Sequence, residues 1–206
     1  MRPLLALIPA VLMLAGTAAA APPPPRDPDW PCQSVKVPEL SLGSVWNGPA
    51  LDPYLAAWSK DADAAELAQR LAQRRVPLDQ AEQEVAQFAA AQAAGDARKE
   101  RLLDLMAGLA SILNQERTSV VDGLSRFGRR QKELARELRG DIEALRAEQD
   151  KPDADPAKVA QLTQQVEWGT RVFGDRRTSI RYACDVPNLI EQRLGALARA
   201  IQAALG

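Results

Sequence analysis

The chain has 206 residues and a formal net charge of −1, with 46% hydrophobic and 26% charged residues, an ordinary composition for one globular domain. It contains no histidine, so neither a Ser-His-Asp nor a Cys-His catalytic arrangement can form, and the commonest zinc ligand is absent. The balanced charge argues against a general nucleic-acid binder, and we expect no enzyme, no cofactor and no metal site.

Residues 1–20 have the layout of a secretory signal peptide. Arg2 precedes an apolar run from Leu4 to Leu14, and Ala18 and Ala20 are the small residues required before the cleavage site. The apolar run is shorter than the ~20 residues needed to cross a bilayer, so cleavage should leave no stable membrane span. The predicted localisation is periplasmic.

The next two segments are not helical in pattern. Residues 21–29 form a proline-rich spacer, which is stiff and extended. Residues 30–58 contain three of the four tryptophans, Trp30, Trp46 and Trp58, among several prolines. Because tryptophan is unfavourable in water, we expect an extended strap packed on the helices. An arm that docks on another protein is the alternative.

Two short helices should follow the strap. Asp63 and Glu66 resemble a capping box at the start of a helix that stops at Val76-Pro77. A second helix is predicted from about Leu78 to Ala94, with Gly95 as its stop. The sequence also allows this helix to continue through Gly95 into the next one.

Two long arms, about residues 98–149 and 156–205, complete the helical domain of residues 59–206. Apolar residues recur along both arms at steps of three or four, which predicts helices with one packed face. Pro152 should end the first helix, and Asp155 and Pro156 should start the second as its cap and first helical residue. The arms should form an antiparallel hairpin in which residue i faces residue 305 − i.

The predicted fold is therefore all-α: a long, coiled-coil-like antiparallel hairpin whose open end is covered by the two short helices. These four segments would make a four-helix base, and the closed end of the hairpin would project as a stalk. Polar residues on the packed face of the first arm, Glu116, Arg117 and Gln131, should fix the register of the arms.

Cys32 and Cys184 are the two cysteines of a chain with a predicted secretion signal, so we expect one disulfide between them. It would clamp the strap to the second arm near Pro187, which should kink or interrupt that helix. A redox role would require a Cys-x-x-Cys pair, which the sequence does not have.

Several arginines should form a basic band around the hairpin, because the predicted register brings two clusters to one level: Arg126, Arg129, Arg130, Arg176, Arg177 and Arg181. One interpretation is a solvated face with intrahelical pairs such as Asp122–Arg126 and Arg129–Glu133. The other is a docking surface for an acidic protein, an anionic lipid or a small anion. Trp168 is either a side cover of the packed face or a partner contact.

The turn between the arms contains three acids, Asp150, Asp153 and Asp155. It lacks the glycine and the distal glutamate of a calcium-binding hand loop. We interpret the three acids as turn and capping residues.

These features predict a secreted or periplasmic, non-enzymatic scaffold, adaptor or chaperone-like assembly protein that contacts an envelope protein. In outline, the architecture is similar to that of hairpin-bearing periplasmic chaperones and adaptors. The alternative is a periplasmic binding module for an anionic small molecule or lipid that uses the arginine band. An enzyme that uses carboxylates and arginines is the third reading. Homo-oligomer formation would cover faces of the stalk left bare in one copy.

Overall fold

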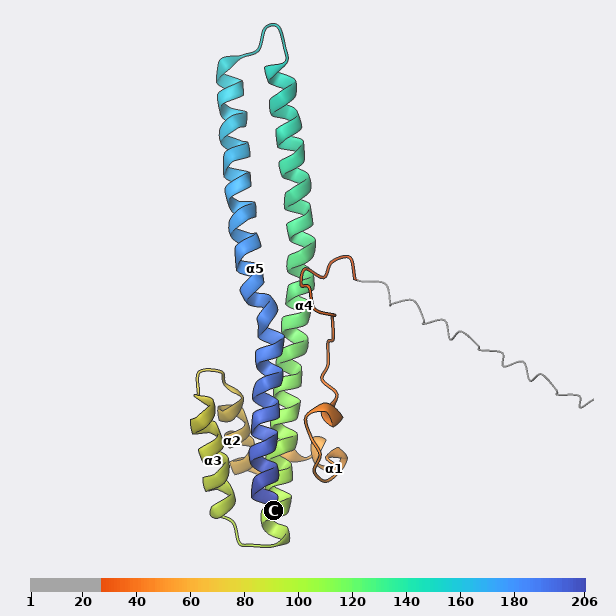
Figure 1. Cartoon of the computed structure of the whole chain (residues 1–206), viewed down its shortest axis with the longest axis vertical. Helices are drawn as coiled ribbons and strands as arrows, with labels where there is room; N and C mark the ends of the chain where they lie inside the picture. Colours follow the sequence, from red (N-terminus) through yellow and green to blue (C-terminus); the bar gives the residue numbers. More distant parts are fainter. Residues whose placement is uncertain (1–26) are drawn as a thin grey trace, which may run out of the picture.

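The computed structural model describes residues 27–206, which fold as helices joined by turns and loops (Figure 1). The predicted signal peptide and residues 21–26 of the spacer lie outside the described residues. The elements in chain order are η1 (Leu42–Ser44), α1 (Asp52–Leu55), η2 (Trp58–Lys60), α2 (Ala62–Ala72), α3 (Leu78–Ala90), α4 (Asp96–Gln149) and α5 (Pro156–Leu205). The all-α fold and the long helical hairpin are confirmed.

The turn of the hairpin has the predicted chemistry. α4 ends at Gln149, and α5 begins at Pro156 with Asp155 as its N-cap. The Asp155 carboxylate accepts a hydrogen bond from the backbone N–H of Ala157 at 2.9 Å, which satisfies one of the free donors at the helix start. Short-range sequence signals therefore determine where the chain reverses.

Two hydrogen bonds between the arms fix their register. The Gln131 side-chain amide donates to the Phe173 carbonyl at 3.2 Å, and the Gln165 side-chain amide donates to the Asp141 carboxylate at 2.7 Å. Both pairs lie within one residue of the relation i to 305 − i, so the predicted antiparallel register is confirmed.

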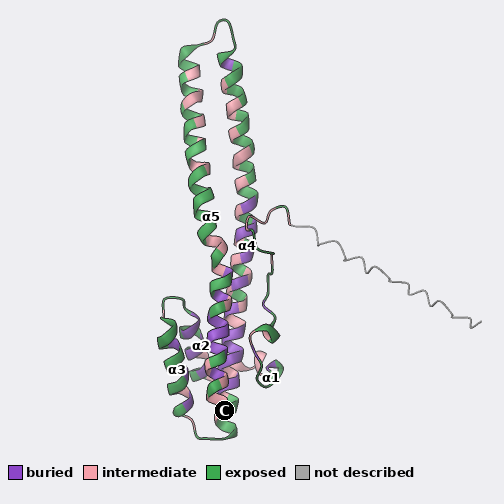
Figure 2. Ribbon diagram, viewed as in Figure 1, coloured by how far each residue is buried: buried purple, intermediate pink, exposed green. Residues whose placement is uncertain are grey.

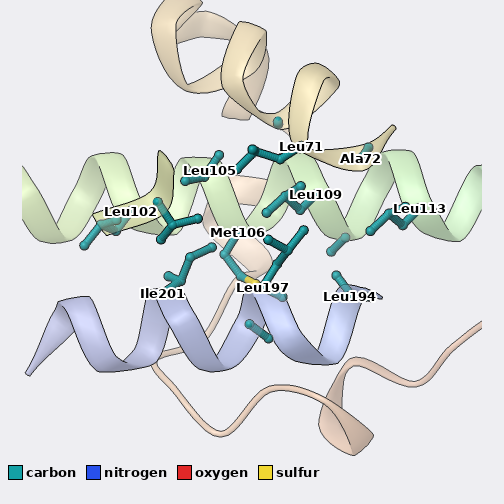
Figure 3. Close-up of a cluster of buried hydrophobic side chains, with 14 of the residues drawn as sticks. Leu71, Ala72, Leu102, Leu105, Met106, Leu109, Leu113, Leu194, Leu197 and Ile201 are labelled. Carbon is teal, nitrogen blue, oxygen red and sulfur yellow. The ribbon is translucent and has the colours of Figure 1, made fainter. Parts of the chain in front are cut away.

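The four-helix base is also confirmed. α2 packs against α4 and α3 against α5, and their leucines and alanines form one buried cluster with those of the long helices (Figure 3). Leu102, Leu109 and Leu197 are among its fully buried members. Gly95 has φ of 101°, a conformation that favours glycine, and it separates α3 from α4. The alternative of one continuous helix through Gly95 is wrong.

The bounds of the short helices differ from prediction. α2 begins at Ala62 with Asp61 as its cap, whose carboxylate accepts from the Ala64 N–H at 3.1 Å. Asp63 is therefore not the cap, because it lies inside the first turn and pairs with Arg101. α2 ends at Ala72 and α3 at Ala90, four residues before each predicted end, since the connecting residues form turns.

Beyond the base the hairpin is a stalk of two helices. From residue 129 to residue 186, Glu148 is the only buried residue, whereas the base is densely buried (Figure 2). The apolar residues on the facing sides of the arms, such as Leu138 and Val166, are only half-buried because no third helix covers them. Pro187 is buried inside α5, which continues through it without interruption. α5 is bent between the stalk and the base (Figure 1).

The strap packs on the base as predicted, although it is not extended throughout. Leu40, Trp46 and Leu51 join the core cluster, and the ring of Trp58 lies against Gly108 of α4. The short helical segments η1, α1 and η2 interrupt the strap. They bring its apolar side chains onto the long helices.

Candidate functional site

The strap crosses the hairpin where the base ends and the stalk begins. Cys32 forms a disulfide with Cys184 of α5, as predicted. Side chains of α4 bind the backbone of the same strap. Asn114 accepts from the Leu40 N–H at 2.8 Å, and Arg117 donates to the Val37 carbonyl. The strap is thus fixed to both arms of the hairpin.

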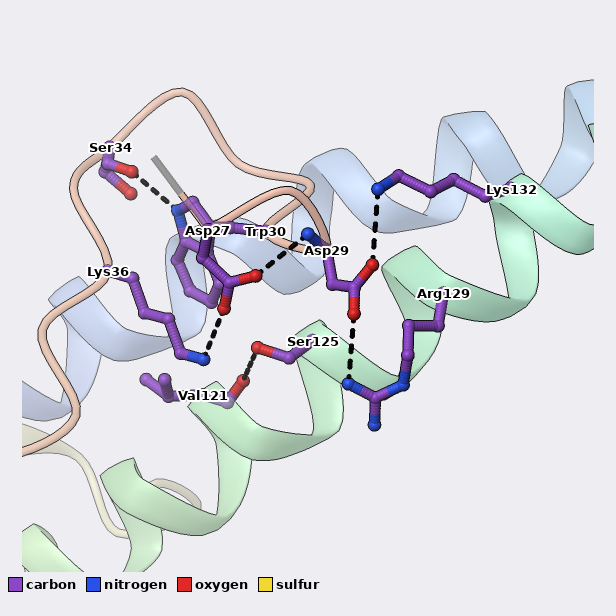
Figure 4. Close-up of polar contacts among 9 residues, drawn as sticks. All are labelled: Asp27, Asp29, Trp30, Ser34, Lys36, Val121, Ser125, Arg129 and Lys132. Carbon is purple, nitrogen blue, oxygen red and sulfur yellow. Dashed lines mark hydrogen bonds and ion pairs between the residues drawn. The ribbon is translucent and has the colours of Figure 1, made fainter. Parts of the chain in front are cut away.

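The last three residues of the predicted spacer, 27–29, form a turn and continue the strap along α4, and one of their carboxylates lies between two basic residues of α4 (Figure 4). Asp29 is 3.3 Å from the Arg129 guanidinium and 3.2 Å from the Lys132 ammonium. Next to it, Asp27 pairs with Lys36 at 2.7 Å, and this hydrogen bond is the main cause that lowers the pKa of Asp27. The indole N–H of Trp30 donates to the Ser34 carbonyl at 2.6 Å. These contacts fold the strap into a compact loop over α4.

The other five band residues are exposed: Arg126, Arg130, Arg176, Arg177 and Arg181. None of the five forms an ion pair with an acid within residues 27–206. The expected intrahelical pairs Asp122–Arg126 and Arg129–Glu133 are not formed. The register brings the two arginine clusters to the same level of the hairpin, as predicted.

Trp168 lies on the stalk with 65% of its surface exposed, and the guanidinium of Arg171 lies 5.8 Å from its ring centroid. Two further apolar residues on α5 that were not predicted as site residues are exposed, Tyr182 at 74% and Leu189 at 49%. Tyr182 and Leu189 follow Trp168 by fourteen and twenty-one residues, so their heptad spacing is the signal in the sequence that could have found them.

Two buried arginines in the base have structural roles that the sequence did not reveal. Arg193 of α5 donates to the carbonyls of Leu71 at 2.6 Å and Val76 at 3.0 Å, which ties α5 to the connection between α2 and α3. Burial lowers the pKa of its guanidinium. Arg117, predicted only as a polar residue on the packed face, is buried under the strap.

A third arginine joins α4 to the start of α2. Arg101 pairs with Asp61 at 2.6 Å and with Asp63 at 2.7 Å, and its guanidinium lies 5.1 Å from the ring centroid of Phe88. The hydrogen bonds from Arg101 lower the pKa of Asp61 and raise that of Arg101 itself. This cluster is paired internally, so we assign it to the stability of the base.

The stalk tip is closed by an ionic clasp. The Glu148 carboxylate lies 2.9 Å from the ammonium groups of both Lys151 and Lys158, so it joins the end of α4 to the turn and to α5. Hydrogen bonds from Lys151 and Lys158 lower the pKa of Glu148 to about 2.

Within residues 27–206 no group of histidines, cysteines or acids has the arrangement of a metal site.

The surface hollows are small or polar. One lies between α2 and α3, and its charges are paired, with Arg70 at 2.8 Å from Glu84. Another lies beside the strap, and its lining includes Trp30, Phe173 and Gln131, whose amide oxygen is buried without a partner in residues 27–206. The exposed features of the stalk, namely the arginine band and the apolar residues of α5, are therefore the candidate site.

Comparison with protein-family models, with curated proteins and with solved structures found no match to this chain. None of the helices formed by residues 27–206 combines the length and apolar character required to span a membrane.

Proposed function

We propose that the protein is a secreted, periplasmic and non-enzymatic scaffold or adaptor that holds or assembles envelope proteins, with the hairpin stalk as its contact surface. The observation that carries the proposal is the burial pattern of the hairpin. About twenty residues of α4 and thirty of α5 lie beyond the base, yet Glu148 is the only residue buried between 129 and 186.

A stalk of this kind adds little to the core of the protein. Ordering each residue costs about 1–2 kcal/mol of backbone entropy, which in a domain is offset mainly by burial of apolar surface. Here the facing apolar residues are only half-buried, and the outer faces are bare (Figure 2). What the stalk supplies is reach and a long accessible surface, which suits contact with another macromolecule.

The proposed compartment follows from two observations. The Cys32–Cys184 disulfide fits an oxidising environment, because disulfides persist in secreted and periplasmic proteins and are rare in the reducing cytosol. The signal-peptide pattern at the start of the sequence supports export.

One observation favours a second candidate, a periplasmic binding module for an anionic small molecule or lipid. Arg126, Arg130 and Arg176 are exposed without an acidic partner in residues 27–206, and the register places them at neighbouring levels of the two arms. Guanidinium groups gathered in this way can bind a phosphate or a carboxylate.

Affinity purification of the full chain from envelope extract, followed by native mass spectrometry, distinguishes the two candidates. A scaffold should retain a protein in stoichiometric amount, whereas a carrier should retain a small anion or lipid. Retention of neither would contradict both proposals.

A matched pair of triple variants tests whether the band takes part. Arg126→Glu, Arg130→Glu and Arg176→Glu should abolish retention of the protein at low salt without changing the helical content. The control makes the same charge change at three exposed arginines farther along the stalk, Arg136, Arg139 and Arg146. The control variant should still retain the protein. Equal loss in both variants would show that only the total charge matters.

A further inference from the structure

Residues 27–36, called the strap loop below, form a small unit of their own. The Asp27–Lys36 ion pair at 2.7 Å joins the two ends of this loop, and the indole N–H of Trp30 donates to the Ser34 carbonyl inside it. None of the residues from 27 to 36 is buried, whereas Leu40, farther along the strap, belongs to the core. The strap loop can therefore leave the hairpin without opening the base.

The strap loop is attached to the hairpin by one covalent bond and by weaker contacts. The covalent bond is the Cys32–Cys184 disulfide. Asp29 pairs with Arg129 and Lys132, whose side chains keep 52% and 49% of their surface exposed. Ion pairs between exposed side chains contribute little, because water competes for both charges. The disulfide is thus the main reason why Asp29 stays over α4.

Asp29 shows which chemical group Arg129 and Lys132 bind. One carboxylate oxygen, Oδ2, lies 3.3 Å from the Arg129 guanidinium, and the other, Oδ1, lies 3.2 Å from the Lys132 ammonium (Figure 4). Ionised donors and acceptors make the stronger class of hydrogen bond. A carboxylate of another protein would fit the same two groups once Asp29 had left them.

The pair of basic residues continues into the open part of the arginine band. Arg126 precedes Arg129 by three residues and Lys132 follows it by three, so the three side chains are neighbours on α4. Arg126 is exposed and forms no ion pair within residues 27–206. A segment with several carboxylates can therefore reach Arg126 at once, but it reaches the other two only by displacing Asp29.

We propose that Arg126, Arg129 and Lys132 form a docking site for an acidic segment of a partner protein, and that Asp29 closes part of this site in cis. The strap loop is a built-in competitor, and the disulfide keeps its effective concentration high. The apparent affinity for the partner is reduced to the fraction of molecules in which Asp29 has left. A protein segment is the favoured occupant, because the present occupant is itself a side-chain carboxylate of a peptide loop. The proposal rests on the scaffold function and names the chemistry of the partner.

A labelled acidic peptide is the probe. Fluorescein-labelled octaglutamate is titrated with the full chain at low salt while anisotropy is recorded. Asp29→Asn should strengthen binding about three- to tenfold, the range expected when one or two exposed ion pairs no longer compete. Asp153→Asn makes the same charge change at an exposed position in the turn of the stalk and should bind like the unchanged protein.

Two changes without a change of charge separate competition from general electrostatics. The Cys32→Ser/Cys184→Ser variant frees the strap loop, and Gly128→Ala places a Cβ where the Asp29 carbonyl rests. Both should strengthen binding of the peptide, as Asp29→Asn does. Gly140→Ala, whose Cβ meets nothing within 4 Å, should leave binding unchanged.

A charge reversal locates the site. Arg129→Glu/Lys132→Glu, made in the variant without the disulfide, should weaken binding of the peptide about tenfold or more. Arg136→Glu/Arg139→Glu, with the same charge change at exposed positions farther along α4, is the control and should not.

Four results would overturn the proposal. They are the absence of binding when the strap loop is free, equal affinity of the unchanged protein and the Asp29→Asn variant, an Arg129→Glu/Lys132→Glu variant that binds as before, and equal binding of octalysine. A gain that appears with vesicles of anionic phospholipid but not with the peptide would assign the site to a membrane and would also overturn it.

The docking site and the scaffold function can fail separately. Retention of an envelope protein with the same affinity by the unchanged protein and the Asp29→Asn variant would leave the scaffold function standing and contradict competition by Asp29. Stronger peptide binding by the variants with a released strap loop, with no envelope protein retained by any of them, would support the docking site and contradict the scaffold function.

Discussion

Gly128 of α4 lies directly against the backbone carbonyl of Asp29, so the strap approaches the helix where the helix has no side chain. A Cβ at residue 128 would overlap the Asp29 oxygen and contact Pro31. Gly128→Ala should therefore displace the strap, and overpacking of this kind lowers the free energy of unfolding by about 1–3 kcal/mol. Denaturant unfolding measures the change.

Gly140, farther along the same helix, is the matched control. A Cβ there meets nothing within 4 Å, so Gly140→Ala should stabilise the helix by about 0.5–1 kcal/mol. Equal effects at both positions would show that the strap does not rest on Gly128.

Arg193 donates to two backbone carbonyls in the base, so replacing it leaves two acceptors without their partner. Arg193→Met keeps most of the side-chain volume and should lower the free energy of unfolding by about 1–3 kcal/mol. Arg199→Met, at an exposed position of the same helix, should change it by less than about 0.5 kcal/mol. If the two variants unfold alike, Arg193 does not hold the connection between α2 and α3.

The Glu148 clasp gives the stalk tip a defined pH dependence. The pKa of Glu148 is about 2 in the folded chain against 4.5 ordinarily, so the clasp contributes fully above about pH 4.5. Its contribution declines as the pH falls below that value and is lost as the pH falls through about 2. A carboxyl-carbon titration by NMR should report the low pKa, and an ordinary value would rule out the clasp.

Loss of the same carboxylate should loosen the tip without affecting the base. Glu148→Gln should speed amide hydrogen exchange near Lys151 and Lys158, while exchange in α2 and α3 stays unchanged. Glu143→Gln, at an exposed position of α4 outside the clasp, should leave exchange at the tip as it was.

The Cys32–Cys184 disulfide closes a loop with a sequence separation of 152 residues. The loop-entropy relation gives a stabilisation of about 5 kcal/mol at most, because residual structure in the unfolded chain reduces it. The Cys32→Ser/Cys184→Ser variant should therefore melt at a lower temperature than the oxidised protein and match the reduced protein. A reduced protein that melts like the oxidised one would show that the strap is held by its other contacts alone.

The parts of the fold that depend on local sequence could be predicted. The repeat of apolar residues indicated both arms, and Asp155-Pro156 fixed the start of α5. The position of the turn alone predicted the register of the two arms, and the Gln131–Phe173 hydrogen bond confirms that register. The cap of α2 was misplaced because Asp61 and Asp63 are both suitable residues. Only the fold shows that Asp61 is the one that accepts the hydrogen bond from the Ala64 N–H.

The buried arginines could not be predicted in the same way. Arg117 and Arg193 occur in charged helices where arginine is usually exposed, and their burial depends on carbonyl groups far away in the chain. The band residues were brought to one level as expected. The pairing of Arg129 with Asp29 was not foreseen, because it requires knowing where the strap crosses the stalk.

Site-specific photo-crosslinking in intact cells tests the stalk's role most directly. A benzophenone side chain at Gln164, exposed on the stalk one turn before Trp168, is compared with one at Gln83, exposed on α3 of the base. If the stalk is the contact surface of a scaffold, Gln164 should give an adduct with one envelope protein and Gln83 should not. An adduct from Gln83 alone, or from neither position, would contradict that role.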